Sequence, residues 1–113
     1  MARRSALKIA AKAAHGFGVF RCKECANQIE KALRAKGFHG RRVEIRGAAG
    51  REYMVCFSYK GGLAAITKTG WHMGIRVQDM MFDNLHPDGM PYEQWLKDFD
   101  APGGIEILSD TPF

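Results

Sequence analysis

Three cysteines in 113 residues are too few, and odd in number, for a disulfide framework, so reduced thiols are expected. No apolar run approaches the roughly 20 residues that a transmembrane helix needs. The basic start at Arg3 and Arg4 is typical of a signal peptide, but Lys8 and Lys12 interrupt the apolar segment that should follow. These absences indicate a domain that acts in a cytosol and is excised from a longer chain.

The chain also lacks internal repeats. At 113 residues it is long enough for one hydrophobic core but not for two, and 46% hydrophobic residues favour a globular domain. The net charge is +5, with the basic residues concentrated before position 52. Because acidic residues lie among them, most of this charge is expected on a solvated surface, although it permits contact with acidic partners or nucleic acid.

Hydrophobic periodicity predicts helices first and antiparallel strands afterwards, which defines an α+β domain. Residues 1–16, with a helix over 4–14, are interpreted as an N-terminal helical linker segment, and residues 17–113 as the domain itself. A short helix that carries Trp95 is expected to pack over the apolar side of the sheet. The other predicted elements are a helix over 22–36 and strands over 43–45, 53–59, 73–77, 80–82 and 105–108.

The helix over 22–36 begins with a Cys-x-x-Cys motif, and its apolar face has to be buried against the sheet. Cys22 comes first, beside Arg21, where the helix N-terminus and the cation both lower a thiol pKa and favour the nucleophilic thiolate. Cys25 lies one turn further in, where burial favours the neutral thiol. Cys22 is therefore the preferred nucleophile, although two small core residues would explain the motif equally well.

Two apolar runs, 73–77 and 80–82, flank a Gln-Asp pair, which is the pattern of a β-hairpin with a two-residue turn. If Val77 pairs with Met80, the strands align residue by residue back towards position 72. Alternate side chains then share a face of the sheet.

In this register His72 and Asp83 are diagonal neighbours, and Gly74 leaves the space between them open. A carboxylate placed in this way holds an imidazole in one tautomer and stabilises its cation. A slip of one residue would put Asn84 in the same place. Asp83 is therefore the preferred partner of His72, and Asn84 is the alternative.

Redox and metal chemistry receive less support. A thioredoxin-like pair should follow a buried strand, and the segment before Cys22 is too short a strand for that. A zinc site needs a second pair of ligands, and Cys56 with His72 or His86 lacks ligand-pair spacing. Cys56 is expected in the core and His86, without a partner in the pattern, in a turn or on the surface. No metal and no cofactor are expected.

Several motifs occur together in a fixed order. They are Phe20-x-Cys22-x-x-Cys25-Ala26, Gly37-x-x-Gly40, Thr67-x-x-Gly70-x-His72-x-Gly74-Ile75-x-Val77, Phe82-Asp83-Asn84-x-His86 and Trp95. With them the chain resembles the papain-fold toxins of bacterial polymorphic toxin systems, and most closely the group called papain fold toxin 2. The resemblance covers about residues 17–100. It implies a papain-like cysteine-peptidase fold, with N-terminal helices packed on a small antiparallel β-sheet.

The resemblance also implies acyl transfer from protein amides by a Cys-His-Asp triad. Water as the acceptor makes such an enzyme a protease or a glutamine deamidase, and an amine makes it a transglutaminase. Such domains are secreted or delivered by contact as the C-terminal part of a larger toxin and act in the cytoplasm of a target cell. The implied partners are a target protein substrate and a cognate immunity protein. No membrane is expected among the partners.

Two features keep alternatives open. Papain also carries Cys-x-x-Cys before its helix, and there the second cysteine is catalytic, which keeps Cys25 as a candidate. Papain's oxyanion-hole glutamine has no counterpart before this helix, so backbone N–H groups at the helix start are expected to serve.

The alternative functions are a small basic nuclease toxin or a nucleic-acid-binding module, and a catalytically inactive interaction domain. The nucleic-acid hypothesis would use His72, His86 and the arginines Arg41, Arg42 and Arg46. No aromatic residues interleave with these arginines, so nucleic acid is not the favoured partner.

Overall fold

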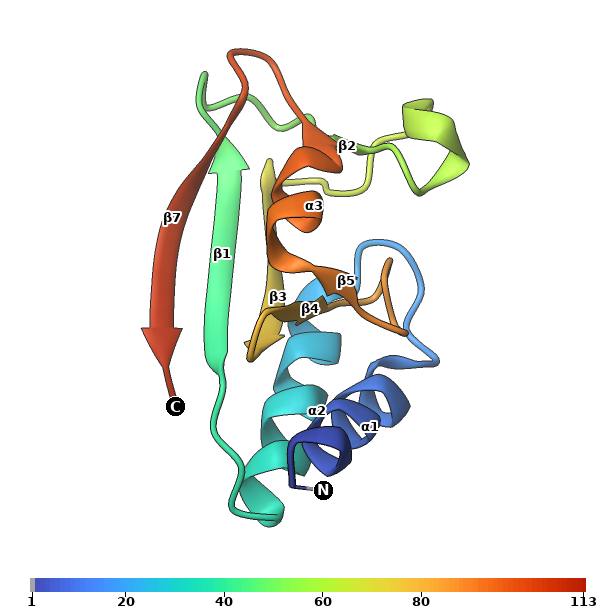
Figure 1. The fold of residues 1–113 in the computed structure, drawn as a ribbon. Coiled ribbons are helices and arrows are strands. Elements are labelled where there is room, and N and C mark those ends of the chain that lie inside the picture. Colours follow the sequence, from blue (N-terminus) through green and yellow to red (C-terminus); the bar gives the residue numbers. More distant parts are fainter. Residues whose placement is uncertain (1) are drawn as a thin grey trace.

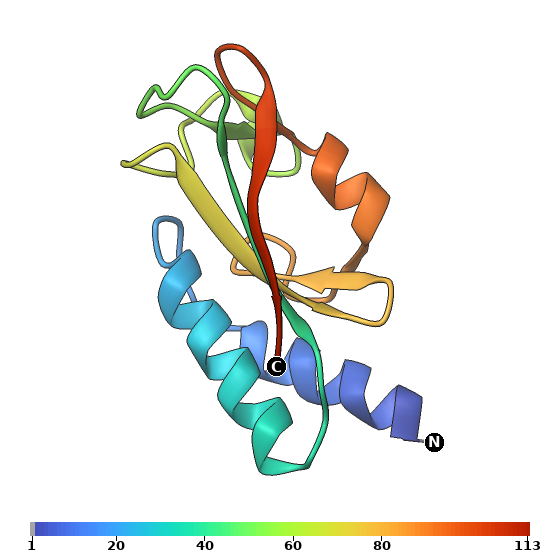
Figure 2. The same ribbon diagram turned by 90° about the vertical axis from the view of Figure 1, so that its left-hand side faces the viewer.

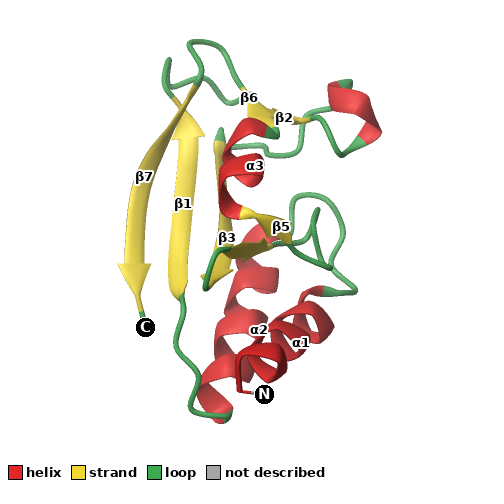
Figure 3. Ribbon diagram, in the orientation of Figure 1, coloured by secondary structure: helices red, strands yellow, loops and turns green. Residues whose placement is uncertain are grey.

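The computed structural model describes residues 2–113, with side chains from residue 4 on, and has the α+β arrangement that the sequence predicts (Figure 3). Both long helices begin or end within two residues of their predicted bounds. The elements in chain order are α1 (Ala2–Ala14), α2 (Cys22–Ala35), β1 (Arg41–Gly47), β2 (Val55–Cys56), the short 3-10 turn η1 (Lys60–Gly62), β3 (Trp71–Val77), β4 (Met80–Phe82), β5 (Met90–Pro91), α3 (Tyr92–Lys97), β6 (Phe99–Asp100) and β7 (Ile105–Pro112).

Within the described residues five of the strands form one antiparallel sheet in the order β5-β4-β3-β1-β7, and β2 pairs with β6 (Figure 1). The hairpin of β3 and β4 has the predicted register, with Val77 opposite Met80 and Ile75 opposite Phe82. Gln78 opens the two-residue turn with φ of 58°, the positive value that a tight hairpin turn requires. The register prediction is therefore confirmed.

Helices cover both faces of the sheet (Figure 2). One face, with Ile75, Val77 and Phe82, packs against the apolar stripe of α2 and against α1. The opposite face packs under α3 and the small β2–β6 pair. The fully buried side chains of this second core are Val43, Ile45, Met54, Cys56, Met81 and Trp95. Alternation along β3 places His72 on this second face, under α3.

Helix α1 contributes small side chains to the first core. Ala6, Ala10 and Ala14 are 3% exposed or less and lie against α2. The thiol of Cys25 donates a hydrogen bond to the Ala14 carbonyl oxygen, with 3.5 Å between the two atoms. The division at residue 16 into linker and domain stays a prediction. None of the helices among the described residues has the length and hydropathy of a membrane span.

The predicted strand over 53–59 is wrong for most of its length. Only Val55 and Cys56 pair, with β6, and the chain beyond them turns into η1. Aromatic residues favour strands only where a partner strand and a packed face exist. Here the partner β6 is two residues long, and Tyr53 and Phe57 remain about half exposed. By contrast, β7 extends beyond the predicted 105–108 because it pairs along all of β1.

Candidate active site

His72 and Asp83 lie side by side at the centre of the molecule. His72 is in β3, Asp83 follows β4, and the imidazole Nε2–H donates to the Asp83 carboxylate over 2.7 Å. Both side chains are fully buried. A Cβ atom on Gly74 would lie 3.0 Å from the Phe82 carbonyl oxygen and 3.4 Å from Asp83 Cβ. The glycine thus permits the close approach, as the hairpin pattern predicts.

Asp83 receives hydrogen bonds on both carboxylate oxygens. Oδ2 accepts from His72 and, over 2.8 Å, from the indole N–H of Trp95. Oδ1 accepts from His86 Nδ1 over 2.8 Å and from the backbone N–H groups of Leu85 and His86. Burial alone would raise the pKa of Asp83, but these bonds and the two imidazolium charges hold it far below its usual range. Asp83 is therefore a carboxylate anion.

Asn84, the alternative third residue, faces elsewhere. Its Nδ2 donates to the carbonyl oxygen of Gly18, in the segment that leads into α2, over 2.9 Å. Its Oδ1 is buried and has no hydrogen-bond partner among the described residues. The geometry therefore places Asp83, and not Asn84, on His72.

Cys22, the first residue of α2, is partly exposed and interacts with His72. Burial alone would raise the thiol pKa, but the nearby imidazole of His72 and the backbone N–H of Met73 outweigh it and lower the pKa. Burial likewise opposes charging of His72, yet its hydrogen bond to Asp83 and the nearby thiol of Cys22 raise the imidazole pKa to about 9. Since Nε2 is bonded to Asp83, Nδ1 is the ring nitrogen left to exchange a proton with the thiol.

Cys25 has a different environment. Its side chain is fully buried, and burial raises its pKa to about 12. With its thiol directed to α1, it behaves as a core residue of α2. The structure thus brings Cys22, His72 and Asp83 together and leaves Cys25 and Asn84 outside that group.

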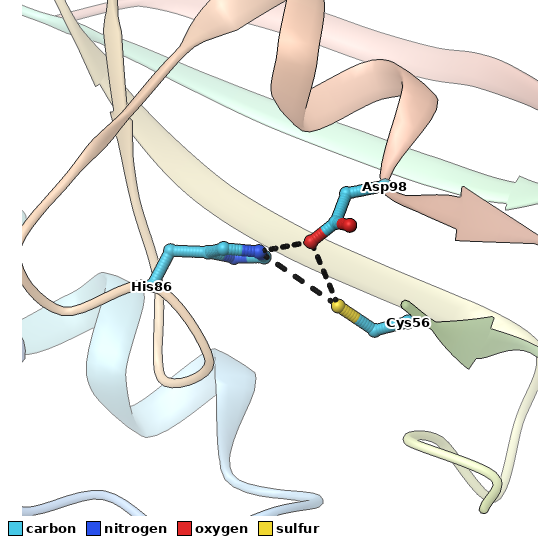
Figure 4. A group of neighbouring side chains, drawn as sticks. All are labelled: Cys56, His86 and Asp98. Atoms are coloured by element: carbon cyan, nitrogen blue, oxygen red, sulfur yellow. Dashed lines mark hydrogen bonds and ion pairs between the residues drawn. The ribbon is translucent and has the colours of Figure 1, made fainter. Parts of the chain in front are cut away.

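His86 opens the turn that the sequence suggests, since Gly89 N–H donates to its carbonyl oxygen, but its side chain is not on the surface. It is 7% exposed, and both ring nitrogens bond to carboxylates, Nδ1 to Asp83 and Nε2 to Asp98 over 2.6 Å. Burial opposes its charge, but these bonds raise its pKa to about 11, so it is an imidazolium. Cys56 lies beside it, and the three side chains of Cys56, His86 and Asp98 point towards one another (Figure 4). The spacing Asp83-x-x-His86 was the only signal in the sequence for this arrangement.

The arginines of the nucleic-acid hypothesis are engaged in ion pairs. Each forms a pair with a carboxylate at 3.2 Å or less, which neutralises the charge that a phosphate would need. The pairs are Arg41–Asp110, Arg42–Glu30 and Arg46–Glu106.

The pKa directions of Cys22 and His72 predict the pH dependence of the site. Alkylation of Cys22 by iodoacetamide should remain fast well below pH 9.0, the ordinary thiol pKa, and fall only when acid protonates the thiolate. Turnover should fall again as pH rises through about 9, where His72 loses its proton. Alkylation rates of wild type and Cys25→Ser over this range test the acid limb. An alkylation rate that follows the ordinary thiol pKa of 9.0 would contradict the lowered pKa of Cys22.

A comparison with protein families places this geometry in context. The family model described as Papain fold toxin 2 matches residues 5–100 of the 113-residue chain. Searches of curated proteins and of solved structures found no match. The match includes α2, the β3–β4 hairpin and α3, which are the elements that carry Cys22, His72, Asp83 and Trp95.

Proposed function

The chain belongs to the papain fold toxin 2 family, and on this premise we propose that it is a cysteine-dependent toxin domain that cleaves amide bonds of proteins. The observation that carries the proposal is the buried His72–Asp83 hydrogen bond, with the free Nδ1 of the imidazole and, at the start of α2, a partly exposed thiol, Cys22, whose pKa this imidazole lowers. This is the constellation of nucleophile, base and orienting group that acyl transfer requires.

The proposed reaction proceeds through a thioester. The Cys22 thiolate forms a C–S bond to the amide carbon, and the imidazolium of His72 gives its proton to the leaving nitrogen as the C–N bond breaks. Water then attacks the thioester, His72 accepts its proton, and the C–S bond breaks to release a carboxylic acid. A peptide amide gives proteolysis, a glutamine side chain gives deamidation with release of ammonia, and an attacking amine gives transglutamination. Asp83 remains ionised and orients His72 throughout.

The start of α2 supplies the proposed oxyanion site. Cys25 N–H is already bonded to the Arg21 carbonyl oxygen, whereas the N–H groups of the helix residues before it have no intrahelical acceptor by position. The N–H of Cys22 itself adjoins the attacking sulfur. It is the donor that replaces papain's glutamine in this proposal.

The biological setting belongs to the same proposal. The domain would be delivered as the C-terminal part of a larger secreted or contact-dependent toxin and act on a target protein in the recipient's cytoplasm. A cognate immunity protein in the producing cell would bind the domain and block the site. The family assignment supports a toxin, and the paired arginines weaken the case for a nucleic-acid substrate.

Serine substitution of each cysteine tests the nucleophile. Cys22→Ser should abolish toxicity on expression in a sensitive cell and abolish fast alkylation, because a serine hydroxyl stays protonated where the thiol ionises. Cys25→Ser is the matched control, one helical turn away, and should keep both properties once circular dichroism shows that it folds.

Mass spectrometry of cellular proteins from the same strains identifies the reaction. Wild type and Cys25→Ser should each produce the same new fragments, deamidated glutamines or cross-links, and Cys22→Ser should produce none. Loss of activity in Cys25→Ser alone would show that Cys25, and not Cys22, is the nucleophile. Full toxicity in both variants would contradict the hypothesis that a cysteine is the catalytic nucleophile.

A further inference from the structure

A second group of reactive side chains lies behind Asp83 and takes no part in the proposed reaction. Cys56 Sγ is 3.7 Å from His86 Nε2 and 3.3 Å from Asp98 Oδ2, and the latter two atoms are 2.6 Å apart (Figure 4). Thiol, imidazole and carboxylate thus direct one donor atom each to a common point. They come from β2, from the loop after β4 and from the end of α3, three segments that are remote in the sequence.

The backbone fixes these side chains before any ligand arrives. Cys56 pairs with Phe99 in the β2–β6 ladder, and Phe57 N–H donates to the Asp98 carbonyl oxygen over 2.8 Å. These bonds hold two of the three groups in register. The third, His86, is held by Asp83, which accepts both its backbone N–H and its Nδ1–H.

We propose that Cys56, His86 and Asp98 bind one divalent cation of the zinc class. A sulfur, an imidazole nitrogen and a carboxylate oxygen are ligands that Zn²⁺ takes in proteins. With bond lengths of about 2.3 Å to sulfur and about 2.0–2.1 Å to nitrogen and oxygen, tetrahedral geometry separates sulfur from either other ligand by about 3.5 Å. The two sulfur distances of 3.7 and 3.3 Å already have that length.

The third distance, between His86 and Asp98, belongs to a hydrogen bond that the cation would replace. His86 Nε2 and Asp98 Oδ2, at 2.6 Å, share a proton, and they have to separate by less than 1 Å to coordinate a metal. The Asp98 side chain is 13% exposed, against 4% for His86, so the carboxylate is the ligand with room to move. On binding, the imidazolium and the thiol each release a proton to solvent, and the metal occupies the space between them.

His86 also has the outer contact that zinc-binding histidines make. Its Nδ1–H donates to Asp83 Oδ1 over 2.8 Å, which fixes the ring orientation and directs Nε2 at the proposed metal. Three protein ligands leave a fourth position for water. A bound cation would tie β2, the loop after β4 and the end of α3 together, and through His86 it would fix the carboxylate that orients His72.

Metal titration of the Cys22→Ser protein tests the proposal, because this background removes the one partly exposed thiol, which lies outside the cluster. Co²⁺ should bind as one equivalent and produce a sulfur-to-cobalt charge-transfer band, and Zn²⁺ should displace it and raise the melting temperature. The double variant Cys22→Ser/Cys56→Ser should lose the band and bind Zn²⁺ more than about tenfold more weakly, the least that loss of even an outer partner costs. Serine retains the size and the donor of Cys56, so the fold should survive.

The matched control is Cys22→Ser/Cys25→Ser, which removes a buried thiol outside the cluster and should bind as tightly as Cys22→Ser alone. Equal affinity and an equal band in the Cys56→Ser variant, or no binding by any variant, would overturn the proposal. Since all these proteins lack Cys22, the result is independent of whether Cys22 is the catalytic nucleophile.

Discussion

His72→Ala is expected to reduce amide cleavage by at least roughly 10²–10⁴-fold, the range that a positioned acid-base group contributes. The change removes the proton donor to the leaving group, and it also removes the cation that lowers the Cys22 pKa. Toxicity on expression and the alkylation rate of Cys22 should therefore fall together. The melting temperature and circular dichroism spectrum of the variant report whether the fold is kept.

Substitutions of Asp83 and Asn84 provide the comparison for His72→Ala. Asp83→Ala should cost activity less completely than His72→Ala, because orientation of the base matters less than proton transfer itself. It should also lower stability, since it leaves the buried donors of His72, Trp95 and His86 without their acceptor. Asn84→Ala removes only the bond to Gly18. A silent Asp83→Ala together with an inactive Asn84→Ala would reverse the assignment of the third residue.

Trp95→Ala is expected to lower the free energy of unfolding by about 3–5 kcal/mol, as for other large truncations in a core. The indole is fully buried, with the ring of Phe99 edge-on at 5.0 Å between centroids. It therefore projects from α3 into the interior and has no surface to offer a substrate. Urea denaturation monitored by circular dichroism measures the change.

Trp95→Phe separates the hydrogen bond from the packing. Phenylalanine fills most of the space but cannot donate to Asp83, so the expected loss is smaller, about 1.5–3 kcal/mol for a hydrogen bond to a charged group. A fall in toxicity without any change in unfolding free energy in either variant would contradict a core role and make Trp95 a substrate contact.

The parts of the site that the sequence predicts are those set by local periodicity. The register of the hairpin follows from two apolar runs and a two-residue turn, and it fixes which side chains flank Gly74. Helical spacing likewise separates the exposed start of α2 from its buried second turn, which distinguishes Cys22 from Cys25. Each pattern lies within a single hairpin or helix.

Long-range pairing accounts for what the sequence did not predict. The sequence does not mark Asp98 as a site residue, because nothing in the chain near position 98 indicates a histidine opposite it. The spacing typical of zinc motifs does not connect Cys56 with His86, because that spacing applies to ligands that share a hairpin or helix. Here the ligand candidates meet through the β2–β6 pair and the loop after β4, so only the tertiary fold reveals them.

Asp83 and Asn84 are consecutive, and they hold opposite partners of the reaction. The first side chain anchors the base, and the second anchors the Gly18 segment from which α2 and the nucleophile start. Two consecutive side chains therefore connect both groups to one strand end. We expect a displacement of this strand end to move imidazole and thiol in the same direction, so that their separation varies less than the position of either.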